Sequence, residues 1–204
     1  MTDGFDSSMR NSILKEMGSI GAAHAATALE KMTGLRIEVK PTVTHKLSLE
    51  NVYSVFSDAP EMQVGIYQRM TEGMNGCLVF FVPKGRSYAF VDLVLDLPEG
   101  NTAVLGEKEQ SALRECGSII CASYMNAIAA MTGTTIKPTV SKLIFDQQGQ
   151  VLEAILQGLF PTDTEVVLIE NDFRIADKEV KGYFILVPAP GELQRLLNLM
   201  EAIL

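Results

Sequence analysis

The sequence carries one long segment twice. Residues 12–37 align without gaps with residues 111–136, and 12 of the 26 aligned positions are identical. A shorter run, KPTV, recurs at 40–43 and at 137–140, after a slip of two residues. A solenoid would need three or more copies of a shorter unit, so two long copies indicate an ancient duplication. We therefore expect two similar units that pack about a pseudo-twofold axis and share one core.

Both copies show the same order of hydrophobic patterns. A long helix comes first; Asp6 or Ser7 can cap the first one, and Gly34 and Gly133 can end the two helices. Runs typical of strands follow, at 35–43, 64–69 and 76–83 in the first copy and at 134–140, 165–170 and 182–188 in the second. Apolar helices are expected near 86–96 and 191–203, and an additional short helix at 151–160.

This order, helix–strand–strand–strand–helix twice, predicts an α/β fold of the α+β kind with a central, mainly antiparallel sheet. The continuously apolar runs GCLVFFV and GYFILV predict central strands that are covered on both faces. We expect a flexible lead at residues 1–10 and a single domain at 11–204, made of two repeats at about 11–98 and 106–204.

The charge and the cysteines exclude several classes of protein. The formal net charge of −8 argues against nucleic acid as a partner, because phosphate binding needs a basic surface. Cys77, Cys116 and Cys121 show no CxxC spacing, so we expect core residues rather than disulfides or zinc ligands. No apolar run approaches the roughly 20 residues of a membrane span. We therefore expect a cytoplasmic protein that does not insert into membranes.

Each repeated helix has an apolar stripe and, opposite it, a strip of small and acidic residues. We call these the outward strips; the first consists of Ser12, Glu16, Ser19 and Ala23, and the second of Ser111, Glu115, Ser118 and Ala122. Small exposed residues let another protein approach closely, whereas a purely solvated face usually carries more lysine and glutamate. Glu16 and Glu115 could be ordinary surface carboxylates, but their presence in both copies favours a shared role in docking.

The two strips resemble the signature of the CheC/FliY/CheX family of chemotaxis phosphatases, and the two-copy layout is most similar to CheC. That signature reads Asp or Ser, three residues, Glu, two residues, Asn. The matching runs here are SILKEMGSIGAAHAATAL and SALRECGSII, and the resemblance covers nearly all of the chain beyond the first ten residues.

The resemblance implies a partner and a mechanism. The partner would be phosphorylated CheY, a response regulator with a short-lived aspartyl phosphate and its own Mg²⁺, so no cofactor or metal is expected on this chain. Glu16 and Glu115 would pair with the regulator, and the residues at 19 and 118 would orient the attacking water, which is catalysis by positioning. The family also implies CheD as a partner, for which Asp146 and the helix at 151–160 are the candidates.

The chain departs from the signature at the water-orienting position, where both copies have serine in place of asparagine. A serine hydroxyl ends closer to the backbone than an amide and can bond to its own helix. The sequence therefore leaves two readings open: hydrolysis by a weaker serine variant, or a non-catalytic module that binds CheY or CheD or acts in a flagellar switch. It contains no P-loop, no GxGxxG after a strand and no Ser/His/Asp set that would indicate a small-molecule enzyme.

Overall fold

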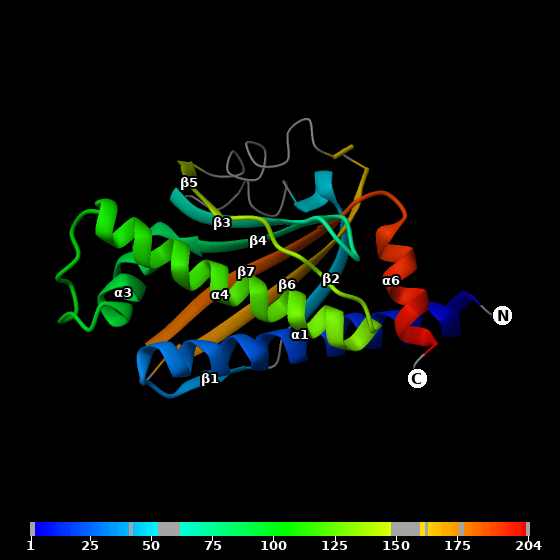
Figure 1. Cartoon of the computed structure of the whole chain (residues 1–204), viewed down its shortest axis with the longest axis horizontal. Coiled ribbons are helices and arrows are strands. Elements are labelled where there is room, and N and C mark those ends of the chain that lie inside the picture. The colour runs from blue at the N-terminus through cyan, green and yellow to red at the C-terminus, as the bar shows by residue number, and fades with distance from the viewer. Residues whose placement is uncertain are drawn as a thin grey trace.

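The computed structural model describes residues 3–40, 43–52, 62–147, 160–161, 163–175 and 178–202. In this part of the chain the strands form one seven-stranded sheet in which all pairs are antiparallel. Two long helices, α1 (Asp3–Thr33) and α4 (Glu107–Thr132), lie side by side on one face of the sheet and run in opposite directions (Figure 1). This arrangement confirms the predicted fold class.

The strand order is β1-β6-β7-β4-β3-β5, and β2 also pairs with β6. The helices α3 (Lys84–Val94) and α6 (Glu192–Glu201) follow β4 and β7. The strands are β1 (Ile37–Val39), β2 (Val43–Ser48), β3 (Met62–Met70), β4 (Gly76–Pro83), β5 (Lys142–Gln147), β6 (Glu165–Ile175) and β7 (Lys178–Pro188).

The pairing is what a twofold axis between the central strands β4 and β7 would produce. An early strand of each half pairs with a later strand of the other half, β2 with β6 and β5 with β3. His45 lies opposite Leu168 and Lys142 lies opposite Tyr67. His45 and Lys142 are 97 residues apart in the chain, as are the two KPTV runs. Because each half supplies an edge strand to the other, the two halves share one sheet and one core.

The core fills both faces of the central strands, as the apolar runs predict. Every residue of β4 except Pro83 is buried. The face under α1 and α4 buries Leu78, Phe80, Phe184 and Leu186 against the apolar sides of the two helices. The opposite face buries Val79, Phe81, Ile185 and Val187 together with Leu49 and Val52. The helices are therefore fixed to the sheet by their inner faces, and their outer faces remain available.

Several predicted boundaries were wrong. α1 begins at Asp3, ahead of the expected caps, so most of the expected 1–10 lead is helical. The run at 134–140 forms only an isolated bridge between Met70 and Pro138, because proline has no N–H to donate to a ladder. The edge strand of that half is β5 instead, which the sequence did not reveal. The helix expected at 151–160 lies outside the described residues except for Phe160.

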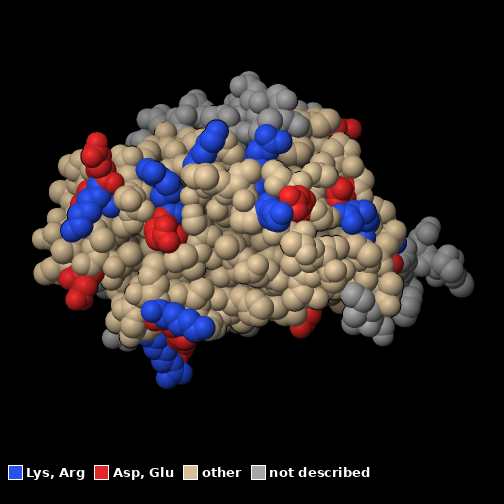
Figure 2. Space-filling view, viewed as in Figure 1, with Lys and Arg blue, Asp and Glu red and all other residues tan. Residues whose placement is uncertain are grey.

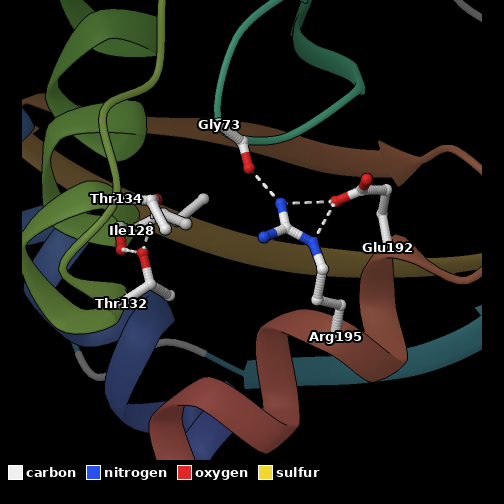
Figure 3. A network of polar contacts seen from close by, with 6 residues as sticks. All are labelled: Gly73, Ile128, Thr132, Thr134, Glu192 and Arg195. Atoms are coloured by element: carbon white, nitrogen blue, oxygen red, sulfur yellow. Dashed lines mark hydrogen bonds and ion pairs between the residues drawn. The ribbon is translucent and has the colours of Figure 1, made fainter.

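Polar contacts join the C-terminal helix to the turn after β3 (Figure 3). Arg195 of α6 donates from Nη2 to the carbonyl oxygen of Gly73 and, at 2.8 Å, to the carboxylate of Glu192. Nearby, the hydroxyl of Thr132 at the end of α4 donates to the carbonyl of Ile128 at 2.7 Å. The contact of Arg195 with Gly73 holds α6 to the β3–β4 turn, whereas the Thr132 contact lies within the end of α4.

Candidate partner-docking site

Both outward strips lie on the free side of their helices. In the first strip Ser12, Glu16 and Ala23 are exposed and Ser19 is half-buried. In the second, Ser111 and Glu115 are exposed, while Ser118 and Ala122 are half-buried. The structure therefore leaves both glutamates exposed to solvent and does not cover them with its own sheet.

The two serines at the water-orienting positions have different hydrogen-bond partners. Ser19 Oγ donates to the carbonyl oxygen of Lys15, one turn earlier in the same helix, at 2.9 Å. Ser118 Oγ donates to Ser141 Oγ at 2.6 Å, and Ser141 lies just before β5 and is buried. Each hydroxyl thus gives its proton to this chain, although its lone pairs can still accept a hydrogen bond from water.

The two glutamates belong to separate sites. Contacts between the antiparallel helices fix their register: Gly21 lies against the ring of Tyr124, and Cys116 Sγ lies 3.9 Å from Met32 Sδ. At a rise of about 1.5 Å per residue, this register separates Glu16 from Glu115 by roughly 20 Å along the helix axes. One reacting phosphate cannot contact both acids, so each strip would have to engage its own partner.

The charges on this face lie mostly around its rim. Neither Glu16 nor Glu115 forms an ion pair with another described residue. Figure 2 shows that the middle of the face, over α4 and α1, is largely uncharged. Ala23 is exposed and Ala122 is half-buried, and their small side chains leave the helix backbones accessible. A partner can therefore approach closely without removing many ions from water.

A groove of about 740 Å³ runs beside the first strip, between α1 and the edge strand β2. Its lining from α1 is Ser8, Asn11, Ser12 and Lys15, and its lining from β2 is Val43 to Leu47. Two of the β2 residues that line the groove lie beside carboxylates of β6. His45 Nε2 is 3.6 Å from Glu170 Oε1, and Lys46 Nζ is 2.6 Å from Glu165 Oε1. Sequence reasoning missed this groove because β2 reaches α1 only through its pairing with β6 of the other half.

The remaining candidates lie apart from the strips. Asp146 is on β5, with its backbone opposite Gln63, and residues 151–159 lie outside the described part of the chain. His24 is exposed on α1 and His45 lies beside Glu170. Among the described residues no group of three or more His, Cys, Asp or Glu side chains is placed to bind a metal.

The three cysteines are buried, as the sequence predicts. Burial raises the pKa of the Cys77 and Cys116 thiols to about 12, and it also raises the pKa of Cys121. Since the thiolate is the reactive form, these side chains pack in the core as apolar groups. In the described part of the chain no helix has the length and the apolar character needed to cross a bilayer.

Comparison with known proteins shows what this chain and its fold are similar to. No family model matches the chain. The chain is 26% identical over 194 residues to the CheY-P phosphatase CheC of Bacillus subtilis, covering 93% of both proteins. It superposes on the crystal structure of Thermotoga maritima FliY with a TM-score of 0.77 at 21% identity, covering 95% of this chain and 96% of FliY. The predicted resemblance to the CheC/FliY/CheX family is therefore confirmed.

Two further solved structures share the fold. The FliM middle domain from H. pylori matches with a TM-score of 0.68 at 8% identity, covering 94% of this chain and 98% of that domain. A chain of the CheX-CheY-BeF3-Mg²⁺ complex from Borrelia burgdorferi matches with a TM-score of 0.52 at 13% identity, covering 83% of this chain and 96% of that chain. At these identities the matches show the fold alone.

Proposed function

We propose that this protein docks on a phosphorylated CheY-type response regulator through its two outward strips and promotes hydrolysis of the aspartyl phosphate. The observation that carries this proposal is the exposure of Glu16 and Glu115 at equivalent positions on the two helices, each followed one turn later by a serine. The similarity to CheC supports the class of activity. Mg²⁺ would belong to the regulator, and we assign no metal or cofactor to this chain.

In this mechanism each glutamate sets the register of the complex by pairing with a cation of the regulator. The serine hydroxyl, one turn further along the helix, would then accept a hydrogen bond from the water that attacks the phosphorus. Positioning of this kind accelerates hydrolysis only if the hydroxyl is correctly placed. A displacement of 1 Å lowers the rate on the order of 10²-fold. Because a hydroxyl reaches less far than an amide and both protons are already donated within the chain, the expected activity is weak.

The test is the lifetime of the phosphate on a ³²P-labelled CheY-type receiver, with Mg²⁺, in the presence of increasing amounts of this protein. The lifetime should shorten with the wild-type protein and return to the unassisted value with Glu16→Ala/Glu115→Ala. Glu38→Ala, which removes an exposed carboxylate from β1, is the matched control and should behave as wild type. An unchanged lifetime at saturating wild-type protein would contradict the catalytic part of the proposal.

A second candidate function is binding without catalysis, as an adaptor for CheY or CheD or in a switch assembly. The observation that favours it is that both serine hydroxyls are engaged within the chain. Binding of the receiver with no change in phosphate lifetime would select this function. CheD binding through Asp146 and residues 151–160 stays a prediction, and loss of CheD capture by Asp146→Ala would support it.

A further inference from the structure

Three large apolar side chains in the described part of the chain are strongly exposed: Val43, Val104 and Val140, at 52%, 73% and 85%. Val43 and Val140 are the last residues of the two KPTV runs, so they occupy equivalent positions in the two halves. A single exposed valine is ordinary on a protein surface and needs no explanation. The same side chain exposed at both equivalent positions, beside both repeated helices, is a feature that neither the core nor the sheet requires.

Val43 and Val140 each lie next to an outward strip. Val43 is the first residue of β2 and lines the groove together with Ser12 and Lys15 of α1. Val140 immediately precedes Ser141, whose hydroxyl accepts the 2.6 Å hydrogen bond from Ser118. In both halves, therefore, an exposed valine borders the helix face that carries the glutamate and the serine.

The charges beside the valines fit an anionic partner. Lys15 and Arg114, the residues just before Glu16 and Glu115, are exposed. On the strands, His45 and Lys142 occupy equivalent positions two residues after the valines and are exposed as well. A chain with a net charge of −8 thus carries, in each half, one basic side chain on the helix and one on the strand, of which His45 lies 3.6 Å from Glu170. The surface around an aspartyl phosphate, with its dianion and neighbouring carboxylates, has the complementary charge.

We propose that Val43 and Val140 are the apolar anchors of the two docking sites, buried by the same phosphorylated regulator that Glu16 and Glu115 engage. This inference rests on the function proposed above. An interface gains most of its affinity from a few apolar side chains that become fully covered, with charged groups around them. Burial of one valine should contribute about tenfold to the affinity.

The experiment measures binding of a CheY-type receiver, loaded with beryllofluoride and Mg²⁺, to the full chain by isothermal titration calorimetry. Val43→Ser/Val140→Ser should weaken binding at each site by at least about tenfold, because each site loses one buried apolar side chain. Val43→Asp/Val140→Asp should weaken it by at least about 100-fold, because it also places a carboxylate against an anionic partner. Val104→Asp removes the third exposed valine, which lies between the two halves, and should bind as wild type. Circular dichroism and thermal unfolding verify that each variant is folded.

The outcomes separate this inference from the proposed function. If folded valine variants bind the receiver as wild type does, while Glu16→Ala/Glu115→Ala does not, the anchors are wrong and the docking proposal stands. If the wild-type protein itself fails to bind the loaded receiver, the proposed function fails. If the valine variants instead change the sedimentation of the protein alone, the valines mark a contact between two copies of this chain and the inference is overturned.

Discussion

The ring of Tyr124 on α4 lies directly against the backbone of Gly21 on α1. A β-carbon placed on Gly21 would come within 2.3 Å of the ring. The equivalent positions across the pseudo-twofold axis are Ala25 and Ile120, both buried. The contact between α1 and α4 at Gly21 thus pairs the smallest residue with a large aromatic one. This contact sets how closely the two helices approach and therefore how the two outward strips are spaced.

Replacement of Gly21 by alanine is expected to destabilise the fold. Alanine favours helix over glycine by up to about 1 kcal/mol, but overpacking a core costs about 1–3 kcal/mol. The overpacking should win, because the tyrosine is stacked on Phe184 at 4.2 Å between ring centroids and cannot move away freely. Thermal unfolding measures the change. Gly85→Ala in α3, where an added β-carbon meets nothing, is the control and should be neutral or stabilising.

Tyr124 also closes a buried polar contact. Its hydroxyl donates to Asn171 Oδ1 at 2.8 Å, and Asn171 Nδ2 donates to the carbonyl of Ile169 at 3.3 Å. Tyr124→Phe leaves a buried amide oxygen without a partner and should lower the free energy of unfolding by about 1–3 kcal/mol, measured in urea. Tyr124→Phe/Asn171→Leu, which removes the polar group as well, should recover part of this loss. Wild-type stability of the single variant would contradict this account.

The fold was largely predictable because its strongest signals are local and occur twice. The repeated helix pattern gave α1 and α4, and the run GCLVFFVP gave β4 with the bounds that the structure has. The edge strands of the sheet could not be predicted from such local signals. β2 and β5 are half-polar and short, and each is fixed by pairing with a strand of the other half, which a reading along the chain does not show.

The candidate site, like the fold, was predictable from the sequence only in part. Glu16 and Glu115 could be placed on exposed faces from helical periodicity alone. The partner of Ser118 could not, since Ser141 comes near it only when β5 takes its place beside β3. The groove beside Ser12 depends in the same way on where β2 lies. The faces of a single helix could therefore be predicted from the sequence, whereas contacts that depend on strand pairing between the halves could not.

Asp92 should make stability depend on pH at the acid end. This buried carboxylate accepts from the backbone N–H of Gly100 and of Thr102, both at 2.8 Å, and so orders the connection between the halves. Thr102 and then Gly100 hold the pKa of Asp92 below its ordinary value by donating to its carboxylate, although burial opposes them. The unfolded chain then binds the proton more readily, so this stabilisation is present above about pH 3.9 and is lost as the pH falls through the native pKa.

The variant Asp92→Asn tests this assignment. Its urea midpoint should lie below that of the wild type at pH 7. The difference should shrink below about pH 4, as first the unfolded wild-type chain and then the native carboxylate take up the proton. The exposed neighbour Asp96, whose φ of 52° asparagine tolerates well, gives the control Asp96→Asn. A constant gap between Asp92→Asn and wild type from pH 7 to pH 3 would show that the charge of Asp92 is not what stabilises the connection.

Restoring an amide should affect the two docking sites unequally. At residue 19 the serine hydroxyl donates to the carbonyl of Lys15, so the hydrogen bond that an asparagine replaces lies within α1 itself. At residue 118 the larger amide must break the 2.6 Å contact with buried Ser141 and push against the start of β5. Ser19→Asn alone should therefore raise the rate of phosphate loss from the labelled receiver on the order of 10²-fold, and Ser118→Asn alone should raise it much less. Equal gains from the two single variants would show that Ser141 does not constrain the second site.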